Sequence, residues 1–150
     1  MADPISVRYL PIREAVCALL AGYPALAEVK AIARDEESFA ALAATQFPAL
    51  AVLFAQNAGE EVALWANQRR DHRYWLEVRV AVRSLQSARA CEDLLFSYVE
   101  AVEDALRSDL TLGGLVRYMS AGLLQRTRRK AGEYWQAEAT FVVMCEKCVN

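Results

Sequence analysis

Apolar residues recur every three to four positions in two segments, the spacing typical of an amphipathic helix. In the first segment, about 11–21, Pro11 suits the first turn because proline lacks a donor that would be unpaired there. The second segment carries a continuous apolar stripe to about Arg107, after a serine, Ser84 or Ser87, that can cap its start. The sequence therefore predicts a short N-terminal helix and a long helix in the second half.

Three consecutive carboxylates at 35–37 indicate the start of another helix, where the helix dipole favours negative charge. Asp35 is the expected cap. This helix should end before Pro48, because a residue that precedes proline is pushed out of helical geometry. The run 28–34 before it alternates poorly and is predicted as a possible strand.

Strands are predicted where apolar and polar residues alternate. Residues 74–83 alternate in this way and are expected to pair with 62–67 across the polar link 68–73, as a hairpin with one wet face. The apolar run 49–55 does not alternate, which favours a strand covered on both faces. We predict that this run is the central strand of a sheet.

A second hairpin is predicted near the C-terminus, with strands at 115–127 and 134–146 joined by the basic link 128–132. With the helices, these strands describe an α+β fold, and we expect the whole chain, 1–150, to be a single domain. Its sheet should be mainly antiparallel, with about four to six strands and two hairpins. Helices should cover one face, including the long helix near 85–107.

Composition narrows the possible classes of protein. The 150 residues are 55% apolar, enough for a real core, so the chain is not a disordered tail. A net charge of -2 offers no general basic field for nucleic acid or membranes. Four unevenly spaced cysteines do not resemble a disulfide framework and favour a reduced, cytoplasmic chain. The longest apolar-looking stretch, 39–55, is interrupted and too short to span a membrane.

The motifs typical of enzymes are mostly missing. The pair Gly113–Gly114 stands alone, without the residues of a phosphate-binding loop, and is expected to form a turn. His72 lies among arginines with no nucleophile nearby in the sequence, so we expect an exposed loop histidine. Cys145 and Cys148 have the spacing of half a zinc site, but the other two cysteines lie far back in the chain. We therefore predict no catalytic residue, no cofactor and no metal.

Positive charge is concentrated on both predicted hairpin links, and tryptophans lie close by. Such arginines can dock on an acidic protein surface or contact phosphates, because they form bidentate bonds. The alternative is that they are solvated loop ends that keep sheet edges apart, and that the tryptophans pack in the core. The candidate interface residues are Arg69, Arg70, Arg73, Trp75, Arg126, Arg128, Arg129 and Lys130.

Five segments of the chain, in their order, resemble the tail terminator, or tail completion, proteins of long-tailed bacteriophages. They are the opening helix Ile12–Leu20, the apolar run Phe47–Leu53, the strand Tyr74–Val82, the helix end and Leu-Gly-Gly turn Ala101–Gly114, and the closing strand Ala137–Val143. The resemblance spans nearly the whole chain and is one of pattern, since each segment taken singly occurs in many folds.

The resemblance implies a non-enzymatic subunit of a ring, commonly of six copies, that caps the tail tube, ends its polymerisation and offers a surface for the head. The implied partners are further copies of the chain, the tail tube protein and a head-completion or neck protein, in the virion tail or neck after assembly in the host cytoplasm. Basic side chains in the ring lumen would touch DNA only transiently and without sequence specificity. No membrane partner is expected.

A closed ring needs an interface in which one patch meets a different patch on the next subunit. We expect a hairpin tip or an exposed edge to meet a helical face of the neighbour. Two alternatives stay open at this point: another phage neck or baseplate component or a related bacterial assembly adaptor, and a small α+β enzyme with a pocket between helix and sheet.

Overall fold

The structure is a computed structural model that describes residues 8–64 and 70–149. The helices are α1 (Tyr9–Ala21), α2 (Glu36–Ala40) and α3 (Ala88–Arg107), with short 3-10 turns at Pro24–Leu26 and Ala44–Gln46. The strands are β1 (Ala31–Ala33), β2 (Ala49–Leu64), β3 (Arg70–Ser84), β4 (Tyr118–Ala131) and β5 (Tyr134–Val149). No helix in these two ranges is long and apolar enough to cross a membrane.

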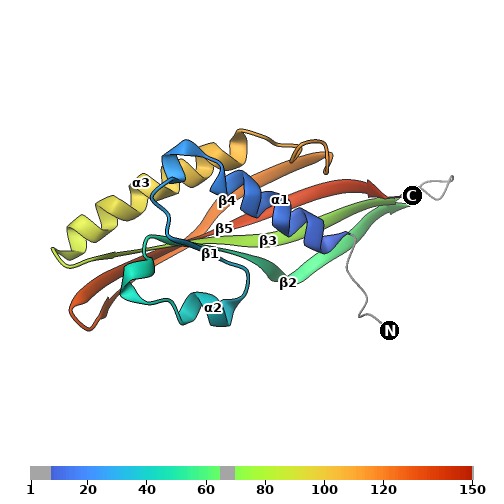
Figure 1. The fold of residues 1–150 in the computed structure, drawn as a ribbon. Helices are drawn as coiled ribbons and strands as arrows, with labels where there is room; N and C mark the ends of the chain where they lie inside the picture. The colour runs from blue at the N-terminus through green and yellow to red at the C-terminus, as the bar shows by residue number, and fades with distance from the viewer. Residues whose placement is uncertain (1–7, 65–69, 150) are drawn as a thin grey trace, which may run out of the picture.

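The five strands form one sheet in the order β1-β2-β3-β5-β4 (Figure 1). Short β1 runs parallel to β2, and every other neighbouring pair is antiparallel. The predicted α+β fold with a mainly antiparallel sheet is therefore confirmed. In this order β3 is the central strand, and it pairs with β5 along most of its length.

The long helix α3 and the N-terminal helix α1 cover one face of the sheet (Figure 1). The alternation seen in the sequence places every second residue of β3 and β5 against these helices. Each large apolar side chain buried in this way stabilises the fold by about 1.5–3 kcal/mol. The largest side chains of this core are Ile12, Val16, Leu20, Leu50, Val52, Tyr74, Leu76, Val78, Val80, Leu95, Leu106 and Phe141.

The sequence had led us to expect helices on one face of the sheet only. The structure shows that the opposite face also carries a helix. Phe39 of α2 packs there on Ala49, Ala51, Leu53 and Ala81 in a second, smaller cluster. The expectation of helices on one face alone was wrong, because the small side chains on this side of β2 leave room for a helix. The cover on both sides of 49–55 was predicted correctly.

Two helix starts are capped by the predicted side chains. Asp35 accepts a hydrogen bond from the backbone N–H of Ser38, at 2.7 Å, and Ser87 accepts one from Ala90, at 3.0 Å. Both bonds satisfy donors that a helix start leaves unpaired. The helix after Asp35 ends at Ala40, well before Pro48.

The apolar run 49–55 and the segment predicted as a separate strand at 62–67 belong to one strand, β2, as far as Leu64. The pairing with β3 is irregular between Phe54 and Gly59, and the strand continues through this irregularity without a break. A side chain at Gly59 would displace the side-chain ends of Tyr9 and His72, which lie against this glycine. β2 is second in the sheet, and the prediction that 49–55 is central was wrong.

The second hairpin link is shorter than predicted, and the strand after the first link begins earlier than predicted. β3 begins at Arg70, and β4 continues to Ala131, so Arg128 and its basic neighbours extend a strand. The turn into β5 needs only two residues, because Gly132 adopts a φ of 64°, which a glycine takes without strain. The chain between β2 and β3, 65–69, lies outside the described residues.

Candidate functional site: the open edge of the sheet

Strand β4 is an edge of the sheet. It pairs only with β5 among the strands that the structure describes (Figure 1). Every residue from 121 to 130 is exposed. An edge strand of this length presents a row of backbone N–H and C=O groups to which another strand can pair. Proteins that stay monomeric shorten, bend or cover such edges. This edge is the surface that the fold leaves most open to association.

Large apolar side chains are exposed on the same strand. The exposed fractions are 38% for Tyr118, 43% for Leu123 and 60% for Leu124. Leu124 lies at an irregularity of the pairing with β5, between Leu123 and Gln125. Two adjacent exposed leucines on an open edge favour contact with another molecule over contact with water.

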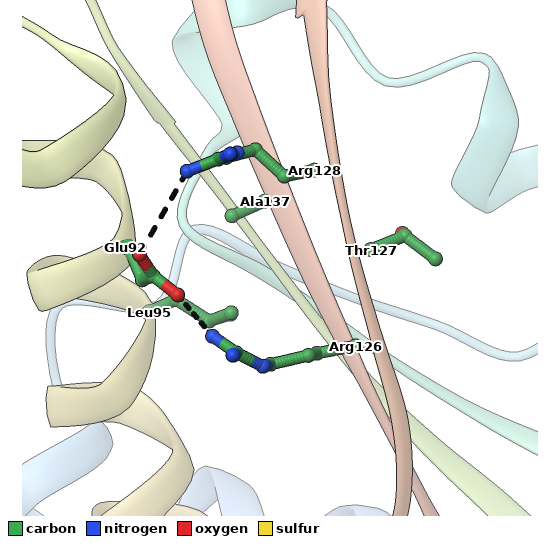
Figure 2. Close-up of a pocket in the computed structure, with 6 residues that line it drawn as sticks. All are labelled: Glu92, Leu95, Arg126, Thr127, Arg128 and Ala137. Atoms are coloured by element: carbon green, nitrogen blue, oxygen red, sulfur yellow. Dashed lines mark hydrogen bonds and ion pairs between the residues drawn. The ribbon is translucent and has the colours of Figure 1, made fainter.

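Basic residues follow the leucines along β4, and two of them turn toward α3. Figure 2 shows Glu92 of α3 between Arg126 and Arg128, with Thr127 pointing the other way. Arg126 donates a hydrogen bond to Glu92, and a guanidinium nitrogen of Arg128 lies 3.8 Å from the other carboxylate oxygen. The three side chains line an open hollow of about 390 Å³ whose floor includes Leu95 and Ala137 (Figure 2). One carboxylate therefore offsets half of the positive charge of this arginine pair.

The other two basic residues of β4 lie on opposite faces of the sheet. The ammonium group of Lys130 lies 4.9 Å from the ring centre of Trp135, a cation–π contact. Arg129 lines a smaller hollow on the α2 side, together with Arg83 and Glu138. The basic half of β4 thus presents charge to both sides of the edge.

The candidates from the first predicted link lie elsewhere. Nε of Arg73 pairs with a carboxylate oxygen of Glu146 at 3.2 Å, and Trp75 is half-buried beside a separate hollow. Arg70 is the first residue of β3, and Arg69 falls outside the described residues. Arg73 and Arg128 pair with β5 residues nine positions apart, about 30 Å along a strand. Four of the eight candidates therefore lie together on β4. Of the other four, the three that the structure describes lie on β3, at the opposite end of the sheet.

His72 is not the exposed loop residue that we expected. It lies in β3, half-buried, with its ring centre 4.6 Å from that of Tyr74. Burial lowers the pKa of His72, and the nearby charge of Arg8 lowers it further. The segment folds as strand because Asp71–Arg73 continues the ladder with β5. His72 therefore favours its neutral form and contributes to packing beside Tyr9.

All four cysteines are free thiols. Cys145 points into the core, where burial raises its pKa to about 12. Cys148 is half-buried, three positions further along β5. Within 8–64 and 70–149, no three His, Cys, Asp or Glu side chains gather closely enough to hold a metal ion.

Two features of the β4 surface were missed by sequence reasoning. One is Glu92, which approaches the arginines only when α3 packs on the sheet. The other is the pair Leu123–Leu124, which breaks the alternation of the predicted strand at 115–127 and thereby carried a signal. Two adjacent leucines in a strand otherwise exposed on both faces indicate an irregular edge.

Comparisons with known proteins assign no family to this chain. No protein-family model matches it, and no curated protein does. Among solved structures, it is similar to a chain from the virion of a native gene transfer agent particle, with 10% sequence identity and a TM-score of 0.39. The match covers 94% of this chain and 99% of that one. At this TM-score the similarity is weak, and it does not assign a function to this chain.

Proposed function

We propose that this chain is a structural virion assembly protein of the tail terminator kind. Its copies form a ring, most simply of six, that caps the tail tube of a phage or prophage particle. The ring ends polymerisation of the tube and provides the surface to which the head joins. The partners are other copies of the chain, the tail tube protein and a head-completion or neck protein.

The observation that carries this proposal is the open edge of β4. Fourteen residues form this strand, and residues 121–130 are all exposed, with two large apolar side chains among them. The other edge of the sheet is different, with a β1 of only three residues beside β2. A chain with two unlike edges has the two unlike patches that a closed ring requires.

The polar side chains of β4 also suit a surface better than a reaction centre. In the hollow beside α3, Glu92 is occupied by Arg126 and Arg128. A general acid or base needs a proton-transfer group that can reach a substrate. Ion-paired groups of this kind instead orient long side chains for contact with another molecule.

DNA in the ring lumen would meet only part of this charge. Glu92 partly neutralises Arg126 and Arg128, while Arg129 and Lys130 are exposed. Phosphate contacts made by so few cations are weak, independent of sequence and sensitive to salt. Such contacts allow DNA to pass without being held.

Electron microscopy of the purified chain mixed with uncapped tail tubes of the same source tests the proposal. We expect added density at one tube end and arrested tube length. The variant Leu124→Lys, which places charge on the open edge, should cap fewer tubes, whereas Leu85→Lys should behave as the unaltered chain. Leu85 is the matched control because its exposed fraction, 61%, equals that of Leu124 within 1% and it lies on neither edge. Tubes that keep growing at both ends in the presence of the chain would contradict the proposal.

A further inference from the structure

We propose that the open edge of β4 in one copy pairs with the β1–β2 edge of the next copy, so that neighbouring sheets continue into one another. This inference rests on the proposed ring function and specifies its contact. It replaces the expected contact between an edge and a helical face by one between two edges.

The strand directions suit this contact. β2, β3, β5 and β4 are antiparallel in turn, so β4 runs opposite to β2, and β1 runs parallel to β2. A neighbour in the same orientation, as rotation about an axis near the strand direction gives, presents β1 and β2 antiparallel to β4. Antiparallel pairing is the slightly more stable geometry per residue.

The two edges also lie at the same height in the sheet. Through successive partners, Thr127 of β4 is level with Glu138, Ala81, Ala49 and finally Ala31 of β1. These five residues stand in one row across all five strands. The middle of β4 therefore faces β1 of a neighbour that continues the sheet without a shift.

Beyond this row, toward the start of β4 and the end of β2, the outer edges of β4 and β2 have no strand partner among the described residues. β1 pairs with β2 only as far as Ala51, and the exposed leucine Leu123 is level with Val52, the next residue of β2. Tyr118, at the start of β4, is level with Glu60. The apolar half of β4 thus meets the stretch of β2 that β1 leaves open.

Charge distinguishes this pairing from a symmetric one. The basic half of β4 carries four exposed cations. The exposed residues around β1 carry four carboxylates and two cations: Glu28, Asp35, Glu36 and Glu37 with Lys30 and Arg34. Pairing of β4 with β4 of another copy would bring eight cations and only two Glu92 carboxylates into one contact, and this excess of positive charge costs free energy. The acidic surroundings of β1 make it the favourable partner.

Cross-linking between engineered cysteines tests the contact. Thr127→Cys and Ala31→Cys are combined in a Cys148→Ser background, because the other three cysteines are buried. The purified chain is treated at high concentration with a short bismaleimide, whose length tolerates a register shift of one or two residues. We expect a ladder of covalent multimers from the double variant and only dimers from a mixture of the two single variants.

Three results would overturn the inference. Dimers from Thr127→Cys alone would show a symmetric β4 contact. A ladder from Thr127→Cys with Ser97→Cys, on the exposed face of α3, would show that the edge meets a helix. No cross-link at all would show that the edges do not meet, because the reagent traps even brief encounters.

The tail-tube experiment separates failure of this inference from failure of the proposed function. Capping of tubes without the Thr127–Ala31 cross-link leaves the ring function standing and rejects the edge contact. A covalent ladder from a chain that never caps tubes supports the edge contact and rejects the function.

Discussion

Single residues on β4 are oriented by partners that lie far away in the sequence. Glu92 holds two guanidinium groups, yet its side chain is 34% exposed and those of the arginines are more than half exposed. An ion pair at such a surface contributes about 0–1 kcal/mol to stability. Its effect is therefore to fix where Arg126 and Arg128 point, which matters more for a contact surface than for the fold.

Cys145 predicts a pH dependence of stability. The folded thiol has a pKa of about 12, against 9.0 for an unperturbed thiol. Between these values the unfolded chain loses a proton that the folded chain keeps, so the free energy of unfolding should fall as pH rises above about 9. The slope approaches about 1.4 kcal/mol per pH unit for a single group.

Urea unfolding measures this effect when it is repeated at about every half pH unit between roughly pH 8 and pH 10.5. The variant Cys145→Ala should lose that part of the slope while keeping the slope due to other groups. An identical pH dependence in the two proteins would show that the thiol ionises as readily in the folded chain as in the unfolded one.

The environment of Tyr74 predicts that removal of its hydroxyl does not destabilise the folded chain. Its side chain is 1% exposed, and its hydroxyl has no hydrogen-bond partner among the described residues. Burying an unpaired hydroxyl costs about 1–3 kcal/mol. Tyr74→Phe should therefore leave the free energy of unfolding unchanged or raise it by about 1 kcal/mol.

Thermal and urea unfolding compare this variant with Tyr74→Leu, which also removes the ring contacts with Tyr9 and His72 and should destabilise. A loss of more than about 1 kcal/mol in Tyr74→Phe would mean that the hydroxyl is bonded in solution.

Elements are held by a balance of local signals and long-range pairing. In α3, the Ser87 cap and an apolar stripe agree, and the helix occupies the predicted range. In β4, local signals indicated a break after 127, yet pairing with β5 extends the strand to Ala131. Where a partner strand offers further hydrogen bonds, polar and charged residues remain in the ladder and the turn becomes tight.

The α3 cap gives a prediction at this scale. Ser87→Ala removes the side-chain acceptor for the N–H of Ala90 and should lower the free energy of unfolding by about 1 kcal/mol. Ser97→Ala, in the middle of the same helix, is the matched control, because its hydroxyl only bonds a backbone carbonyl of the helix. Equal effects of the two substitutions in urea unfolding would show that the cap does not matter.

Prediction from sequence worked best where burial repeats regularly. The buried positions of β3 and β5, such as Val80 and Phe141, follow from alternation alone, and the starts of α2 and α3 follow from their caps. The candidate surface was predicted only in part: its arginines were identified, but they were placed in a link. The order of strands also escaped prediction, because pairing depends on contacts between segments that alternation cannot rank.

The whole molecule combines a well-covered centre with two unlike open edges. The middle strands β3 and β5 are paired on both sides, whereas β4 is exposed from 121 to 130 and β1 covers only the first residues of β2. The open edges of a monomer present backbone N–H and C=O groups with which another copy can pair, and this favours association. In the proposed ring, copies related by rotation would pair both edges at once, and closure of the ring would end the assembly.

Salt should weaken this association. The proposed contact brings the cations of β4 near the carboxylates around β1, and exposed charges are screened when the Debye length falls from about 14 Å to about 4 Å between 0.05 M and 0.5 M salt. Sedimentation velocity should show fewer oligomers at high salt. The charge-reversed variant Arg129→Glu should also associate less, and its combination with Glu37→Arg should recover part of the loss. Association that strengthens with salt would indicate a contact driven by apolar area alone.

The sequence by itself determined the local choices: which residues of the alternating strands face the core, where α3 begins and ends, where α1 ends, and that 49–55, 74–83 and 134–146 are extended. These depend on periodicity and on side chains that bond to nearby backbone. The tertiary structure alone decided that α2 covers the second face, that β3 lies at the centre, and that Glu92 meets the arginines of β4. Those features arise from packing between distant segments, whose free energy no local pattern contains.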